Sequence, residues 1–220
     1  MSGCSELESL PEITVPMKSL LRLNLSKTGI KEIPSSIQFL TRLGTLDMSG
    51  CSELESLPEI TVPMKYLESL NLSKSSIKEI PSSIQFLTRL ETLDMSGCSE
   101  LESLPEITVP MNSLKSLNLS KSSIKEIPSS SFKHMIFLKT LELDGTPIKV
   151  LPELPSLLMF LKTHDCASLE TAISIFNIKS LMTPSDFTNC FKLDQKQLIE
   201  AMHLKIQVSL LTPSFFLLSL

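Results

Sequence analysis

Five cysteines carry the most reactive side chains of this 220-residue chain. A cysteine nucleophile needs an imidazole within hydrogen-bond reach of its thiol, about 3 Å. The sequence offers one local pairing, His164-Asp165-Cys166. We expect Cys166 to point into the core and His164 to point out of it, which keeps the two groups apart. No Cys-x-x-Cys pair and no zinc-type spacing occurs.

Other chemical motifs are also missing from the sequence. The six glycines form no phosphate-binding pattern, and the net charge of −4 gives no basic footprint for nucleic acid. Carboxylate pairs such as Glu53/Glu55 and Glu100/Glu102 recur only because a larger unit recurs, which indicates a solvated surface. We therefore expect no catalytic residue, no metal, no cofactor and no nucleic-acid partner.

The cysteines and the carboxylate pairs lie within sequence repeats, which must position them. The block SGCSELESLPEITVPM occurs unchanged from Ser2, Ser49 and Ser96, at intervals of 47 residues. Each interval contains two Leu-x-x-Leu-x-Leu patterns, in which methionine sometimes takes the last place. The first leucines of these patterns are Leu20, Leu43, Leu67, Leu90, Leu114 and Leu138, and a degenerate copy begins at Leu158. This period is typical of leucine-rich repeats.

The pattern predicts an α/β-type repeat solenoid. We expect a leucine-rich-repeat horseshoe with a parallel β-ladder on the concave face and a mostly irregular or short-helical convex side. Each unit presents three apolar side chains that only a stacked neighbour can bury. Ile-Pro or Leu-Pro ends each return segment, where proline disfavours a long helix. One helical turn is predicted over 35–40, with a serine cap.

The cysteines fit one position of this pattern. Cys51 and Cys98 are expected at an inward turn position that Thr28, Ser75, Ser122 and Thr146 fill in the alternate repeats. At strand spacing Cys51 and Cys98 lie two rungs, about 10 Å, apart. A disulfide needs Cα atoms within about 7 Å. We therefore predict free, buried thiols.

Two regions are expected along the chain. Residues 1–171 form leucine-rich repeats with a partial first repeat and about seven strands, and residues 172–220 form a post-repeat segment. In that segment Asp194 is predicted to cap a helix with apolar positions at Leu198, Ile199, Met202 and Ile206. The last stretch, 208–220, is an atypical apolar tail. Because the chain starts in the middle of a repeat, we expect a fragment of a longer protein or a truncated gene product.

The ends of the chain predict a cytoplasmic or nuclear protein. The first residues are polar and acidic, unlike a secretory signal. The apolar tail contains Pro213 and is shorter than the roughly 20 apolar residues of a spanning helix. We expect no membrane span.

Several stretches resemble one known family. LDMSGCSELESLP and LNLSKSSIKEIPSSIQFLTRLETL resemble the leucine-rich region of plant Toll-type nucleotide-binding leucine-rich-repeat (TIR-NBS-LRR) disease resistance proteins. LPELPSLLMFLKTHDCASLETA is similar to the final repeat of that subgroup, and DFTNCFKLDQKQLIEAM to the start of its C-terminal jelly-roll domain. The resemblance covers about residues 1–207. The Toll-type and nucleotide-binding segments are absent, so their NAD cleavage and nucleotide switching are not assigned here.

The resemblance implies a protein-binding module of an intracellular plant immune receptor. Such a module senses a pathogen effector or a host guardee and holds the nucleotide-binding and Toll-type domains inactive. Outward strand positions are the candidate contacts on the concave face. They are Arg22, Asn24, Asp47, Asn71, Asp94, Asn118, Glu142, Asp144, Phe160, Lys162 and His164. The residue types vary most among the last five, and these include Phe160, an aromatic residue of the kind that often anchors a binding partner.

Two other interpretations stay open. The chain is either a generic leucine-rich-repeat scaffold or adaptor outside immunity, or a non-functional truncated remnant. An enzyme is the least favoured class, because the sequence contains no catalytic constellation.

Overall fold

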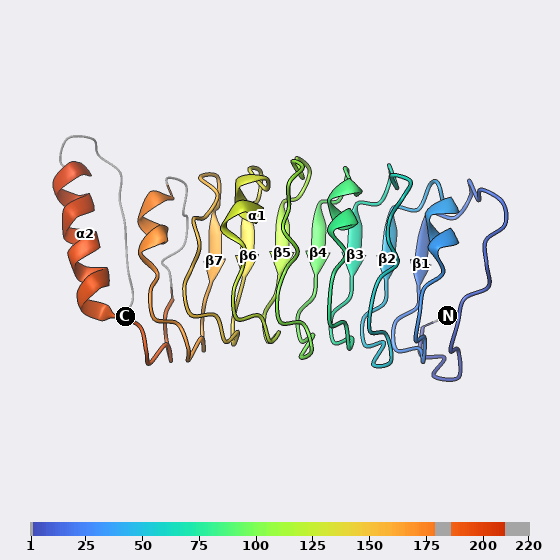
Figure 1. Cartoon of the computed structure of the whole chain (residues 1–220), viewed down its shortest axis with the longest axis horizontal. Coiled ribbons are helices and arrows are strands. Elements are labelled where there is room, and N and C mark those ends of the chain that lie inside the picture. Colours follow the sequence, from blue (N-terminus) through green and yellow to red (C-terminus); the bar gives the residue numbers. More distant parts are fainter. Residues whose placement is uncertain (1, 179–185, 210–220) are drawn as a thin grey trace.

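Seven parallel strands form one open sheet in chain order (Figure 1). The computed structural model describes residues 2–178 and 186–209. The strands are β1 (Arg22–Asn24), β2 (Thr45–Asp47), β3 (Ser69–Asn71), β4 (Thr92–Asp94), β5 (Ser116–Asn118), β6 (Thr140–Glu142) and β7 (Phe160–Lys162). Each strand pairs only with its neighbours in sequence, which confirms the predicted repeat solenoid.

The register places identical positions of successive coils beside one another. Leu46 pairs with Leu23 on one side and with Leu70 on the other, and the column continues to Leu161 in β7. Backbone amides just after the strands extend the ladder, as Leu25 N donates to Asp47 O at 2.7 Å. A slip of one residue would turn every leucine outward, so burial of this column fixes the register.

The return path is irregular apart from short helical turns. These are η1 (Ser35–Phe39), η2 (Ser82–Phe86), α1 (Ser129–Lys133) and η3 (Ile173–Asn177). The predicted serine cap is wrong, because Pro34 occupies the N-cap with φ −64° and ψ 144° and no side chain caps the turn. Ser36 Oγ instead accepts a bond from Ile13 N of the preceding coil at 2.9 Å. The hydroxyl thus joins two coils rather than starting a helix.

The core is a continuous aliphatic column. Leucine, isoleucine and methionine side chains from every coil join one buried cluster, which also includes Phe132. Because each coil buries its leucines only against the coils beside it, stability depends on nearest-neighbour contacts.

The coil path continues beyond the expected end of the repeats at residue 171. Asp165 N donates to Thr188 O at 3.0 Å, and Asp194 N donates to Glu170 O at 2.9 Å. The helix α2 (Gln195–Ser209) follows, and Asp194 Oδ1 accepts Gln197 N at 2.9 Å, which confirms the predicted cap.

The apolar face predicted for this helix is confirmed in part. Leu198 is buried, but Ile199 is 38% exposed. The side chains of Met202 and Ile206 and the tail 210–220 lie outside the described residues. In the described part of the chain, no helix is both long and apolar enough to cross a membrane.

Candidate protein-binding face

The outward side chains of the seven strands form two parallel columns, here called the strand face. The first column is Arg22, Thr45, Ser69, Thr92, Ser116, Thr140 and Phe160. The second column is Asn24, Asp47, Asn71, Asp94, Asn118, Glu142 and Lys162. The structure thus aligns nine of the candidates on this face, and Asp144 and His164 follow β6 and β7 directly.

The first five members of the second column support the backbone. In each, a side-chain oxygen accepts the amide two residues later, at 2.9–3.0 Å. This local bond is an Asx turn, and it satisfies an amide where the chain leaves the strand. The residues concerned are Asn24, Asp47, Asn71, Asp94 and Asn118. Their role in binding stays a prediction, whereas their role in the turn is observed.

The last two members of this column contact each other instead. Lys162 Nζ lies 2.9 Å from Glu142 Oε2, and this hydrogen bond raises the pKa of Lys162. Asp144 accepts His164 N of the next coil at 2.9 Å. The Asx turns are thus absent at Glu142 and Lys162, whereas a side-chain contact between coils also occurs at the other end, where Asn24 Nδ2 donates to Asp47 Oδ2 at 3.1 Å.

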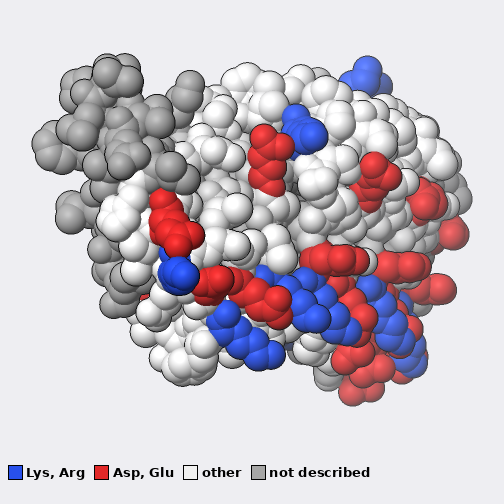
Figure 2. Space-filling model, turned by 60° about the vertical axis from the view of Figure 1, so that its left-hand side comes forward, with Lys and Arg blue, Asp and Glu red and all other residues white. Residues whose placement is uncertain are grey.

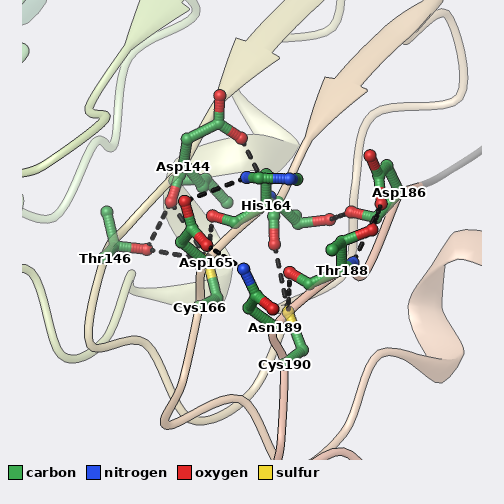
Figure 3. Close-up of polar contacts among 11 residues, drawn as sticks. Asp144, Thr146, His164, Asp165, Cys166, Asp186, Thr188, Asn189 and Cys190 are labelled. Carbon is green, nitrogen blue, oxygen red and sulfur yellow. Dashed lines mark hydrogen bonds and ion pairs between the residues drawn. The ribbon is translucent and has the colours of Figure 1, made fainter.

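A polar cluster surrounds His164 at the same end (Figure 3). His164 Nδ1 lies 3.0 Å from Asp165 Oδ2, and Asn189 Nδ2 donates to Asp165 Oδ1 at 2.6 Å. The hydrogen bond to Asp165 raises the pKa of His164. Bonds from Asn189 and His164 lower the pKa of Asp165. Sequence reasoning missed Asp165 and Asn189; the only signal is their common place directly before a cysteine.

The imidazole and the thiol of His164-Asp165-Cys166 point apart, as predicted. Cys166 is buried and its thiol donates to Leu143 O at 3.1 Å, while the ring of His164 contacts Asp165. The pair therefore lacks the contact that a Cys-His nucleophile requires. Among the residues that the structure places, no group of three or more His, Cys, Asp or Glu side chains could hold a metal ion.

Inward turn positions form a buried polar ladder. Thr28 Oγ1 and Cys51 Sγ both donate to Leu25 O, at 2.7 and 3.1 Å. The next pair, Ser75 and Cys98, repeats this arrangement, and burial raises the pKa of the Cys98 thiol. Cys51 and Cys98 are free and buried, as predicted, whereas Cys4 is exposed. The thiols also act as hydrogen-bond donors, beyond the apolar role expected of them.

Phe160 is the one large aromatic among the predicted contacts. It is 38% exposed and lies beside Thr140, while Arg22 stands at the opposite end of the sheet.

Charged side chains form a band along one edge of the molecule (Figure 2). Ion pairs between neighbouring coils recur every 47 residues, in Lys31–Glu8, Lys78–Glu55 and Lys125–Glu102. Such exposed pairs contribute little to stability.

Comparisons with known proteins agree with this fold. The family described as Leucine Rich Repeat matches residues 113–135. The leucine-rich repeat domain of the type III effector XopL is similar at 20% identity and TM-score 0.57, over 84% of this chain and 66% of that chain. A chain of the Drosophila Toll–Spatzle complex is similar at 20% identity and TM-score 0.65, over 77% of this chain and 24% of that chain. No curated protein sequence matches.

These comparisons establish architecture. The chain contains a leucine-rich-repeat region and has the leucine-rich-repeat fold, as the sequence predicts. At 20% identity the two structures show the fold alone, and this chain spans less than two thirds of each.

Proposed function

We propose that this chain is a protein-binding module whose partner contacts the C-terminal end of the strand face. The proposed contacts are Glu142, Asp144, Phe160, Lys162 and His164. They combine an exposed aromatic ring with charges of both signs, which suits a polar protein surface with one anchoring pocket.

One contrast carries the proposal. In β1 to β5 the residues of the second column form Asx turns, so a substitution there would remove a hydrogen bond of the turn and lower the stability of the fold. Glu142 and Lys162 leave that pattern, and their ion pair, in which the lysine side chain is 56% exposed, contributes little to stability. Glu142 and Lys162, which hold no backbone amide in the described coils, are therefore available for a partner, whereas Asp144 also accepts His164 N at 2.9 Å.

The finer proposal places the module in an intracellular plant immune receptor. There it would bind a pathogen effector or a host guardee, or hold a nucleotide-binding domain inactive, in the cytoplasm or nucleus. The resemblance of the repeats to TIR-NBS-LRR proteins supports this role. The passage of the last coil into α2 is compatible with entry into a following jelly-roll domain. The Toll–Spatzle complex, one chain of which has a similar fold, is described as a molecular hub in Drosophila development and innate immunity.

A direct test uses the full chain and the nucleotide-binding domain of a full-length plant receptor of the resembling family. Association should be measurable by calorimetry, and Lys162→Glu together with Phe160→Ser should weaken it at least tenfold. Thr92→Ala, at the same column of the face as Phe160, is the matched control and should leave affinity unchanged.

The outcomes separate the remaining alternatives. No association with folded protein removes the autoinhibitory role and favours a scaffold outside immunity. The proposed binding end would be refuted if Thr92→Ala weakened the affinity as much as Lys162→Glu together with Phe160→Ser. Rapid degradation of the chain in plant cells would favour a non-functional remnant.

A further inference from the structure

The buried polar ladder changes composition at its C-terminal end. From Thr28 to Ser122 the inward turn position alternates between hydroxyl and thiol, and Thr146 then adds a second hydroxyl before two thiols. The order is Thr28, Cys51, Ser75, Cys98, Ser122, Thr146, Cys166 and Cys190. Among the described coils, two thiols are neighbours only in the last two, at Cys166 and Cys190.

Where a hydroxyl precedes a thiol at this position, the two side chains are in direct contact. Thr28 Oγ1 lies 3.4 Å from Cys51 Sγ, and Thr146 Oγ1 lies 3.5 Å from Cys166 Sγ.

Cys166 and Cys190 keep the same relation to the backbone. Cys166 Sγ donates to Leu143 O and Cys190 Sγ donates to Thr163 O, both at 3.1 Å and both in the preceding coil. The bond from Asp165 N to Thr188 O, at 3.0 Å, sets the two coils in register (Figure 3).

We propose that Cys166 and Cys190 are an oxidation site that forms a reversible disulfide between the last two coils. Neighbouring strands lie about 4.8 Å apart, within the range of about 4.4–6.8 Å for the Cα atoms of a disulfide. Cys51 and Cys98 are separated by Ser75 and lie outside this range. The proposal thus concerns one pair of the five cysteines.

The reaction exchanges thiols with a small-molecule disulfide such as oxidised glutathione. The Cys190 thiolate attacks one sulfur of the reagent, whose S–S bond breaks and releases one thiolate. The Cys166 thiolate then displaces the second, so the protein loses two electrons and two protons and the reagent gains them. Cys190 is the entry point because it is 8% exposed, while Cys166 is 0% exposed.

The environment of the pair makes the reaction slow at neutral pH. The hydrogen bond between the two thiols lowers the pKa of Cys166 to about 7, and the same bond together with burial raises the pKa of Cys190. Attack by Cys190 is therefore slow at neutral pH, and its rate increases with pH.

Oxidation would act on the candidate binding face. The same two coils are joined by the bond from Asn189 to Asp165, whose carboxylate also contacts His164. A disulfide would hold Asn189 against Asp165 and would link the coil that leads into α2 to the coil before it. The site therefore couples the redox state to the rigidity of the polar cluster.

The test treats the folded full chain with oxidised glutathione at pH 8.5, blocks free thiols with N-ethylmaleimide and identifies linked peptides by mass spectrometry. We expect a Cys166–Cys190 link and a fall in free thiols from five to three in every chain that links. Dithiothreitol should restore all five.

Two variants secure the result. Cys190→Ser should abolish the link, and Ser75→Cys should create a new link to Cys51 or Cys98, because it places thiols in neighbouring coils. Cys166 and Cys190 recovered as separate blocked thiols, or as glutathione adducts alone, would overturn the proposal. A Cys51–Cys98 link in the natural sequence would do the same, because it would require the coils to open.

Discussion

Asp94 offers the clearest test of the division between structural and free residues on the strand face. Its Oδ1 accepts Ser96 N at 2.9 Å, and Ser96 lies half-buried at the turn that leaves β4. Asp94→Ala removes the acceptor, although the amide regains some contact with water. Loss of a comparable cap at a helix start costs about 0.5–2 kcal/mol. We expect the free energy of unfolding to fall by about 1 kcal/mol.

The assay is urea denaturation of the full chain, with Glu142→Ala as the matched control in the same column. Glu142 is half-buried and pairs with the largely exposed Lys162, so its loss should cost about 0.5 kcal/mol. In thermal unfolding, about 1 kcal/mol corresponds to a fall in Tm of about 2–4 °C for a chain of this size. The dependence on urea should keep its slope in both variants.

Two results would refute the reasoning. One is an Asp94→Ala variant as stable as the parent, since the Asx turn would then contribute nothing. The other is a Glu142→Ala variant that loses as much stability as Asp94→Ala. Either removes the contrast on which the proposed binding end rests.

Three further perturbations test the core, a turn and the polar cluster. Leu93→Ala, at a side chain 5% exposed, should lower the free energy of unfolding by about 2–5 kcal/mol in urea denaturation, and a loss below 1 kcal/mol would contradict the buried column. Gly97→Ala should cost about 1–2 kcal/mol in the same assay, because φ is +72° and the added Cβ would lie 3.1 Å from Lys74 Cγ; an unchanged midpoint would refute that geometry. The His164 titration followed by NMR should have its midpoint above about 6.5 and move down in Asp165→Asn, since the charged pair forms only below the folded-state pKa and is lost as pH rises through it. No change in Asp165→Asn would show that the two side chains are not paired.

The leucine period predicts the register of the sheet because burial leaves few alternatives. Leu23, Leu46 and Leu70 must all face the core, and this fixes which residues form the outward columns. The same logic places Cys51 and Cys98 inward, since their positions recur with the unit.

Local hydrogen bonding is harder to predict. Asn71 is polar and outward, so by pattern alone it resembles a binding residue, although its oxygen accepts Ser73 N at 2.9 Å. The available signal is the serine two residues later, which recurs through β5. Ser35 likewise suggests a cap, but the preceding proline already sets the backbone that begins the turn.

The end of the repeats shows another limit of the pattern. The segment before Cys190 has Met182, Ser185 and Phe187 where earlier units have leucines, so the rhythm is lost in the sequence. Backbone hydrogen bonds at Thr188 and Asp194 nevertheless continue the coil path. Such bonds join main-chain groups, so they do not require leucine at these positions.

Native-state hydrogen exchange tests the stacked-coil account most directly. The amides just after the first five strands donate to the next coil at 2.7–2.8 Å; they are Leu25, Met48, Leu72, Met95 and Leu119. Stacking predicts slow and similar exchange for the interior members of this series. Exchange of the Met48, Leu72 and Met95 amides at the rate of an unfolded chain would contradict the fold and the binding face built on it.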